Sequence, residues 1–210
     1  NIDKVIYASS RMKIYYKYAE ELIKKNKAYV CTCKQNKYKR FIENSEPCPC
    51  RELNINEQLK RWKLMFKKYK AGDAVLRIKT NLLDKNPALR DWPAFRINET
   101  KHVKTGKKYR VWPLMNFAVA IDDHELNIDT AIRAKDHRDN AIRQKQLFDF
   151  FNWKIPETLF TGKIHFIDLR MSASATRKLI QKGKYKGWDD VRLPFLPALR
   201  RRGYQRGAFL

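Results

Sequence analysis

Residues 113–137 constrain the fold of this chain more than any other stretch. An apolar run ending at Ile121 reads as a strand, and the four polar residues after it as an acidic turn. A second strand is expected over Asn127 to Ile132, followed by Arg133 and then by a helix over Asn140 to Phe151. This order is typical of an open α/β sheet, which presents polar groups where its strands end. We therefore expect an α/β fold.

Helices and short strands are predicted to share the rest of the chain. A stripe of apolar residues with helical spacing runs from Ile14 to Ile23, between Ser9 and Asn26. The remaining expected elements are a strand at 28–31, a Cys-rich loop up to Arg51, a helix capped by Asn54 or Asn56 and ended by Gly72, a strand at 74–80, short strands separated by turns over 81–109, a helix at 175–180 capped by Ser172 or Ser174, and a short helix ending near Arg202.

The charge of the chain points to a polyanionic partner. The 210 residues contain 46 Lys and Arg against 22 Asp and Glu, which gives a formal net charge of +24. Residues 11–40 and residues 177–210 each carry a net charge of +8. Such an excess is typical of proteins that bind nucleic acid, although a basic surface that serves only solubility is the alternative. We find no apolar run long enough for a transmembrane helix and expect no membrane partner.

All four cysteines fall in one window, as Cys31 and Cys33 and then Cys48 and Cys50. Two close pairs joined by a loop can supply the four thiolates of a tetrahedral zinc site. Two disulfides or four free thiols are the alternatives, but no feature of the chain suggests secretion, and cytosolic chains rarely keep disulfides. We expect a cytoplasmic protein with a bound Zn²⁺. The role of this ion is expected to be structural, because four thiolates leave no open position for catalysis.

Several long strings resemble the class I glutamyl-tRNA synthetases of the archaeal type. They are AYVCTC and PCPCRE around the cysteines, GDAVLRIK at 72–79, NPALRDWPAFRI at 86–97 and GWDDVRLPFLPALRRRGY at 187–204. The resemblance implies the second half of a Rossmann-like catalytic domain with an inserted α+β domain that binds the tRNA acceptor stem and carries the zinc loop. It divides the chain into 1–26 (a helix of the nucleotide fold), 27–110 (the inserted domain), 111–168 (the second catalytic half) and 169–210 (a signature loop and the start of a stem-contact region).

The signature loop of this family is of the K-M-S-K-S type, and Arg170, Met171 and Ser172 begin its counterpart here. Ala173 stands where the second lysine is found, so a cation for the ATP phosphates has to come from another residue. The resemblance implies catalytic roles for Arg170, Ser172, Ser174 and Arg177, and ATP contacts from Met171, Ser172 and Lys178. A simple helix N-cap at Ser172 is compatible with these roles.

Arg133 matches the family arginine that holds the side-chain carboxylate of glutamate. A guanidinium fits a carboxylate in a bidentate way and disfavours the neutral amide of glutamine. Asn116 is a second candidate substrate contact, or a turn cap, and Met115 replaces a tyrosine common in relatives. We expect residues 122–125 to make turns and hydrogen bonds rather than a metal site, since adjacent side chains point in different directions. His137 is expected at a helix start; without the resemblance, Arg133 could equally pair with Asp136.

The first class I signature, of the H-I-G-H type, has no counterpart around His102, His124, His137 or His165. We therefore expect a partial glutamyl-tRNA synthetase that lacks its N-terminal catalytic half and an anticodon-binding domain, and that is inactive alone. With that half, it would use ATP and Mg²⁺ to activate glutamate and transfer it to tRNA. The alternatives are a glutaminyl-tRNA synthetase of the same class and a non-catalytic basic RNA-binding module with zinc.

Overall fold

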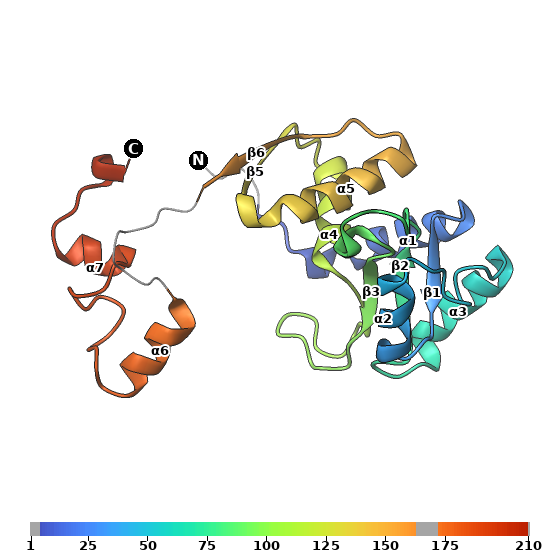
Figure 1. The fold of residues 1–210 in the computed structure, drawn as a ribbon, viewed down its shortest axis with the longest axis horizontal. Helices are drawn as coiled ribbons and strands as arrows, with labels where there is room; N and C mark the ends of the chain where they lie inside the picture. The colour runs from blue at the N-terminus through green and yellow to red at the C-terminus, as the bar shows by residue number, and fades with distance from the viewer. Residues whose placement is uncertain (1–4, 163–171, 210) are drawn as a thin grey trace. The chain divides into compact units, whose positions relative to one another are not determined.

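The computed structural model describes residues 5–162 and 172–209 (Figure 1). The chain divides into two compact units, Asn1–Thr161 and Gly162–Leu210, and each is described by itself. Within the described residues, no helix combines the length and the apolar character that crossing a bilayer requires. The signature-loop residues Arg170 and Met171 lie outside the described residues.

The first unit contains a four-stranded antiparallel sheet in the order β1-β2-β3-β4. Its strands are β1 (Ala28–Cys31), β2 (Val75–Ile78), β3 (Pro93–Ile97) and β4 (Val111–Pro113). The expected strands at 28–31 and 74–80 are confirmed, and β3 confirms that the segment 81–109 contains a strand. The 3-10 helix η2 (Pro87–Leu89) precedes β3.

Successive side chains of a strand point to opposite faces of the sheet, and both faces of this sheet are covered. From β1, Ala28 and Val30 enter the main core, which α1 (Met12–Lys24) and α3 (Ile55–Lys67) complete. Tyr29 and Cys31 point to the opposite face, where they form a second buried cluster with Tyr38 and the other cysteines. Both helices were predicted, and Asn54 caps α3 by accepting a hydrogen bond from the amide of Glu57 at 2.9 Å.

The second buried cluster contains a helix that the sequence did not suggest. Residues 35–43 form α2 (Gln35–Glu43) inside the segment expected to be a Cys-rich loop. Tyr38, Phe41 and Ile42 have helical spacing and pack in this cluster, but the basic residues among them and the flanking cysteine pairs favoured the expectation of a loop. α2 therefore stands between the two cysteine pairs in the sequence.

The apolar run before Asp122 is a helix and not a strand, which corrects the expectation for residues 113–121. It forms α4 (Met115–Glu125), and the four polar residues 122–125 are its last turn. The buried residues Phe117, Ala118, Ala120 and Ile121 have the spacing of one helix face, and α4 packs on α1, β3 and α5. A continuous apolar run does not distinguish a strand from a buried helix, and packing against α1, β3 and α5 selects the helix here.

A βαβ unit follows, made of β5 (Thr130–Ala134), α5 (Arg138–Phe151) and β6 (Glu157–Thr161). β5 and β6 pair in parallel, with Arg133 opposite Phe160. The predicted strand and helix are confirmed here, although β5 begins three residues later than expected. Ile132 and Leu159 of this two-stranded sheet are 71% and 46% exposed. Parallel sheets are normally covered on both faces, so this pair has an uncovered apolar surface.

The second unit is small and helical, with α6 (Ala173–Gln181), α7 (Leu196–Arg201) and the 3-10 helix η4 (Arg206–Phe209). The Oγ of Ser172 caps α6 by accepting a hydrogen bond from the amide of Ala175, as expected. At the other end of α6, Gly183 adopts φ +75° and the chain reverses in a Schellman motif. The buried carboxylate of Asp190 receives two hydrogen bonds from the guanidinium of Arg192 and fixes the following loop.

Candidate functional site

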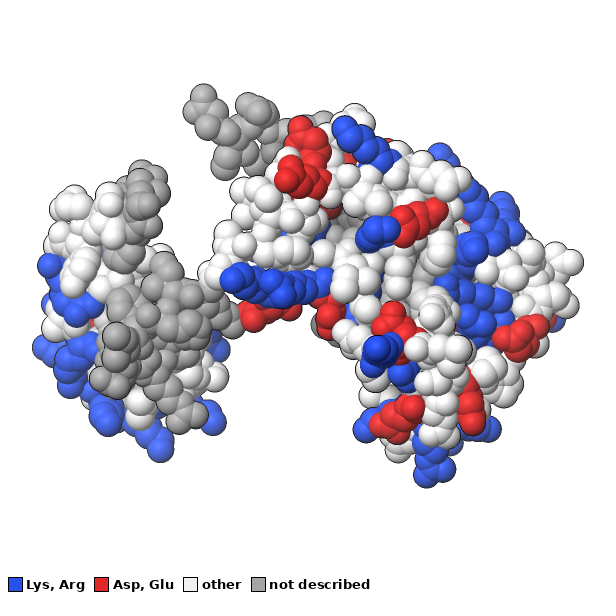
Figure 2. Space-filling view, turned by 45° about the horizontal axis from the view of Figure 1, so that its top comes forward, with Lys and Arg blue, Asp and Glu red and all other residues white. Residues whose placement is uncertain are grey.

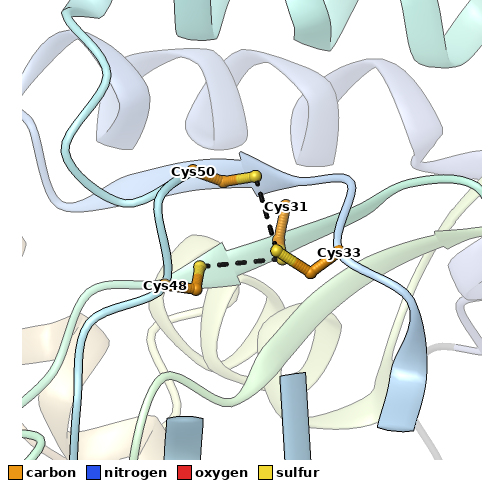
Figure 3. Close-up of side chains that lie close together, drawn as sticks. All are labelled: Cys31, Cys33, Cys48 and Cys50. Carbon is orange, nitrogen blue, oxygen red and sulfur yellow. Dashed lines mark hydrogen bonds between the residues drawn. The ribbon is translucent and has the colours of Figure 1, made fainter. Parts of the chain in front are cut away.

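The four cysteines converge on one point of the first unit (Figure 3). Their sulfur atoms all lie within 4.8 Å of one another, and Cys31–Cys48 and Cys33–Cys50 are each 3.8 Å apart. A tetrahedron with metal–sulfur bonds of about 2.3 Å has edges of about 3.8 Å, so the donor set and its spacing fit a tetrahedral ion. All four are free thiols, since these distances far exceed a disulfide bond of about 2.05 Å.

The surroundings of the thiol cluster favour a negative charge on Cys50. The Thr32 amide and the Arg61 guanidinium both donate to its sulfur, at 3.5 and 3.3 Å. The pKa of Cys50 is lowered mainly by hydrogen bonds from the thiols of Cys31 and Cys48. Hydrogen bonds from the amide and the hydroxyl of Thr32 lower it further. Hydrogen bonds to Cys48 and Cys50, together with burial, raise the pKa of Cys31, and burial raises that of Cys33 to about 11. A bound cation would reverse this resistance of Cys31 and Cys33 to ionisation.

A cleft of about 700 Å³ opens beside the thiol cluster and contains three arginines. We call it the arginine cleft, and it is lined by residues of α2, η2, β2, the start of α4 and α5, including Tyr38, Arg77, Arg90, Trp92, Met115, Asn116 and Arg143. The Arg77 guanidinium stacks on the Tyr38 ring with its Cζ 3.3 Å from the ring centroid. Aromatic rings beside guanidinium groups are common where proteins hold unpaired nucleotides.

The positive charge of the arginine cleft is not neutralised by the groups that hold its arginines. Arg90 donates to the backbone oxygens of Asp84 and Ile42, both at 2.7 Å. Arg143 donates to the Ala88 carbonyl, and burial lowers its pKa. Within the described residues, none of the three guanidiniums forms an ion pair with a carboxylate, and the buried Nε of Arg77 has no hydrogen-bond partner. Glu43 also lines the cleft and pairs with Lys39, so the three guanidiniums leave an excess of positive charge for an anion.

Arg133, the expected glutamate contact, is held by Asp123 and not by Asp136. Its Nη2 donates to Asp123 Oδ2 at 3.3 Å, and both side chains are less than one fifth exposed. Burial raises the pKa of Asp123, and the positive charge of Arg133 opposes that rise. The Nε of Arg133 is buried and has no partner within the described residues. The guanidinium therefore keeps an unused donor after its ion pair is made.

The other polar residues at the end of α4 each have a separate structural partner, as expected. Asp122 accepts hydrogen bonds of 2.6 Å from both Arg11 and Tyr15. The ring of His124 stacks on Trp153 with a centroid separation of 3.6 Å, and Glu125 accepts a hydrogen bond from Tyr18. Among the described residues, only the cysteines come together as a group of metal ligands.

The remaining predicted residues are distributed over two places. Asn116, in the first unit, donates to Asn140 and accepts a hydrogen bond from Gln144. His137 precedes α5 directly, which confirms its position at a helix start. In the second unit, the hydroxyls of Ser172 and Ser174 lie 3.3 Å apart at the N-terminus of α6, and Arg177 and Lys178 are exposed on the same helix. The amides and hydroxyls at this helix start can accept an anion.

Arg77, Arg90 and Arg143 were missed by the sequence analysis as members of a site. They come from β2, the loop before β3 and α5, so no local pattern connects them. The short string Arg90-Asp91-Trp92 was a local sign, because two charged residues adjoin a tryptophan there in a segment rich in turns. Basic side chains are distributed over both units, with fewer acidic ones among them (Figure 2).

The structure is a mixed α/β fold with a cluster of four thiols and a cleft that contains three arginines, and a family model identifies the class of protein. The family model described as tRNA synthetases class I (E and Q), catalytic domain, matches residues 1–209. The chain belongs to this family.

Archaeal glutamate–tRNA ligases are among the similar relatives. The chain is 52% identical to that of Pyrococcus horikoshii over 203 residues and 46% identical to that of Methanobrevibacter smithii over 203 residues. These alignments cover 96% and 97% of this chain but only 36% of either relative. The chain thus spans little more than a third of the length of the curated relatives it matches.

Solved structures of the same family share the fold. A crystal structure of a glutamate tRNA ligase from Elizabethkingia meningosepticum in complex with its amino acid aligns with a TM-score of 0.53 at 19% identity. The alignment covers 84% of this chain and 38% of the solved chain. The glutamate-tRNA synthetase of Elizabethkingia anophelis aligns with a TM-score of 0.52 at 20% identity. The expected α/β fold of a class I synthetase is therefore confirmed, whereas the inserted domain stays a prediction.

Proposed function

We propose that this chain is part of a glutamate–tRNA ligase that activates glutamate with ATP and transfers it to the 3′ end of tRNA. The observation that carries the proposal is the identity of about one half to archaeal glutamate–tRNA ligases along 96% of the chain. In the first step, a glutamate carboxylate oxygen attacks the α-phosphorus of ATP and pyrophosphate leaves. In the second, a hydroxyl of the terminal adenosine attacks the carbonyl carbon and releases AMP.

We assign selection of the amino acid to Arg133. Its buried Nε has no partner within the described residues, and its ion pair with Asp123 orients the guanidinium without using all its donors. A glutamate side chain can accept from such a fork, whereas the amide of glutamine would also direct N–H groups at it. This supports glutamate over glutamine. Met115 and Asn116 are neighbours in the sequence, and both line the arginine cleft. We assign Asn116 a supporting substrate contact.

We assign the ATP phosphates to the start of α6 and the loop before it. Ser172 and Ser174 offer hydroxyls at a helix N-terminus, where phosphate oxygens are favoured. Arg177 and Lys178 are exposed cations on the same helix, and Arg170 and Met171 precede it in sequence. These groups would stabilise the negative charge that develops on the phosphates. Mg²⁺, when bound with ATP, supplies a further positive charge to the same oxygens.

We assign the acceptor end of tRNA to the arginine cleft and structural zinc to the thiol cluster. The cleft combines guanidinium groups that lack carboxylate partners, within the described residues, with the rings of Tyr38 and Trp92. Zn²⁺ held by Cys31, Cys33, Cys48 and Cys50 would fix both ends of the segment that carries α2, one wall of the cleft. The proposed division into 1–26, 27–110, 111–168 and 169–210 follows these roles.

The uncovered face of β5 and β6 supports a need for the rest of the protein. Ile132 and Leu159 are exposed there, and the chain spans 36% of the length of its relatives. We propose that the strands of the N-terminal catalytic half cover this face and bring the first class I signature to the site. The chain alone is then expected to be inactive.

The test is ATP–pyrophosphate exchange with glutamate and tRNA. The assay compares the chain alone with the chain plus a polypeptide that carries the N-terminal part of an archaeal glutamate–tRNA ligase. Exchange only in the second mixture, with glutamate but not glutamine, supports the proposal. No exchange in either mixture, with tRNA binding retained, would favour the second candidate. That candidate is a non-catalytic RNA-binding module, and the unpaired arginines of the cleft are the observation in its favour.

A further inference from the structure

Asp91 lies between the thiol cluster and the arginine cleft in an unusual backbone conformation. Its side chain is 1% exposed, and its φ angle is +35°. A positive φ is uncommon for a residue other than glycine, although aspartate and asparagine adopt it more often than most, and it persists where the surroundings hold the residue in place. Such positions are concentrated at functional sites, so the contacts of Asp91 indicate what this strained backbone serves.

The carboxylate of Asp91 faces the thiol cluster. It accepts hydrogen bonds from the Tyr29 hydroxyl at 2.9 Å, from Arg51 Nε at 2.8 Å and from the Thr80 amide at 2.8 Å. The Tyr29 hydroxyl is also 3.7 Å from the sulfur of Cys48. Tyr29 is fully buried in the same strand as Cys31, so its position follows that of the thiols.

The backbone of Asp91 faces the arginine cleft. Its carbonyl oxygen accepts from the Tyr38 hydroxyl at 3.0 Å and from Arg77 Nη1 at 3.3 Å. Its sequence neighbours Arg90 and Trp92 both line the cleft. One residue therefore contacts the surroundings of the thiols with its side chain and the stacked Tyr38–Arg77 pair with its main chain.

We propose that Asp91 is a positioning residue that couples metal occupancy of the thiol cluster to the affinity of the arginine cleft for RNA. The inference rests on the proposed function of the cleft. Four sulfurs held by one ion fix Tyr29 through β1, the strand that it shares with Cys31, and the Tyr29 hydroxyl donates to the carboxylate of Asp91 and fixes it. The peptide carbonyl of Asp91 then holds the hydroxyl of Tyr38 and the guanidinium of Arg77 in the geometry that receives a phosphate. Residues around a metal site commonly act in this indirect way.

Two variants interrupt this path at different points without removing a cysteine. Tyr29→Phe deletes the hydroxyl that joins Cys48 to Asp91. Asp91→Asn keeps a residue that tolerates positive φ but removes the charge that Arg51 and Tyr29 contact. Asp149→Asn is the matched control, because Asp149 is exposed and pairs only with Lys145 on α5 within the described residues.

The measurement is the Kd for a tRNA transcript by fluorescence anisotropy, at one salt concentration, for zinc-loaded and chelator-treated chain. The native chain and the control should bind about tenfold more weakly without metal, a usual size for coupling between sites. Tyr29→Phe and Asp91→Asn should keep one metal per chain and the absorption spectrum of tetrahedral Co²⁺. Their Kd in the loaded form should already be raised and should change little on chelation. A native dependence on metal in both variants would overturn the proposal.

A second readout applies if the metal-free chain unfolds, which circular dichroism detects. In the zinc-loaded form, Tyr29→Phe, Arg77→Ala and the double variant form a cycle. A non-additive effect of at least about threefold on Kd supports the coupling, and additivity overturns it. The exchange assay of the proposed function does not depend on this cycle. If exchange is observed but the effects of the two substitutions are additive, the proposed function stands and only the coupling role of Asp91 is refuted.

Discussion

At the scale of single residues, the proposed selection of the substrate depends on the ion pair of Arg133 and Asp123. Asp123 occupies one edge of the guanidinium and leaves the buried Nε without a partner in the described part of the chain. A buried donor without an acceptor costs free energy, and an incoming carboxylate relieves that cost. The resemblance predicted Arg133 as a substrate contact, and that role stays a prediction. The sequence could not identify Asp123 as the partner of Arg133, because that contact depends on α4 being a helix.

Arg133→Ala should raise the KM for glutamate by about two orders of magnitude, since a charge-assisted pair contributes roughly 1.5–3 kcal/mol. The KM for ATP should change little. Arg133→Lys should recover part of the loss, because a lysine retains the charge but not the bidentate geometry. Both constants are measured by exchange in the reconstituted mixture. Equal effects on glutamate and ATP would contradict the assignment.

Asp122→Ala should destabilise the first unit by about 3 kcal/mol, because it leaves the charge of Arg11 without its partner. The Arg11 side chain is only 15% exposed, and Tyr15 would also lose its acceptor. Urea unfolding followed by circular dichroism measures the change. Asp149→Ala, at an exposed position on α5, is the control and should change the free energy of unfolding by less than about 1 kcal/mol.

At the scale of elements, the sequence was adequate where a periodic pattern coincided with a cap. The amphipathic stripe of α1 and the Asn54 cap of α3 gave both helices correctly. α4 was predicted as a strand because its apolar residues are continuous, and only packing against α1, β3 and α5 selects the helix. α2 was missed because its short apolar face, Tyr38, Phe41 and Ile42, lies among basic residues between the two cysteine pairs. The arginine cleft, which α2 completes, could not be predicted for the same reason.

Cys48→Ser should abolish stoichiometric zinc binding and loosen α2. With one thiolate lost, the tetrahedral donor set is incomplete, and binding of the metal is part of the folding free energy of such a loop. Metal analysis of the purified chain and hydrogen exchange over residues 35–43 measure the two effects. A fully protected α2 in a metal-free native chain would refute a structural role for zinc.

The metal-free chain should lose stability in alkaline solution. Burial raises the pKa of Cys33 from 9.0 to about 11, so its thiol stabilises the folded chain below pH 9. That contribution disappears as the pH rises through 11, because the folded state then releases a proton that the unfolded state has already lost. Urea unfolding of chelator-treated chain between pH 8 and pH 11 measures the decline. Cys33→Ser should make this decline of the free energy of unfolding with pH less steep than in the native chain. Identical profiles for the two chains would contradict the role of the Cys33 thiol.

At the scale of the whole molecule, the net charge of +24 predicts strongly salt-dependent binding of tRNA. Each phosphate that a cation neutralises releases counterions, so the logarithm of the binding constant falls linearly with the logarithm of the salt concentration. Arg77→Ala, Arg90→Ala and Arg143→Ala should each reduce this slope by about 1 if they contact phosphates. Lys60→Ala on the exposed face of α3 is the control. Unchanged slopes in all three variants would exclude the cleft as a phosphate contact.

The thiol cluster also has a kinetic consequence. Cys31, Cys48 and Cys50 are buried, whereas Cys33 is only partly so. An ion held by the four sulfurs would therefore be approached first at Cys33, by a competing chelator or by an oxidant. The rate of metal exchange would be governed by how often this one thiolate detaches, and the order of ligand loss would start there. The least protected cysteine of the cluster would set how long the chain keeps its metal.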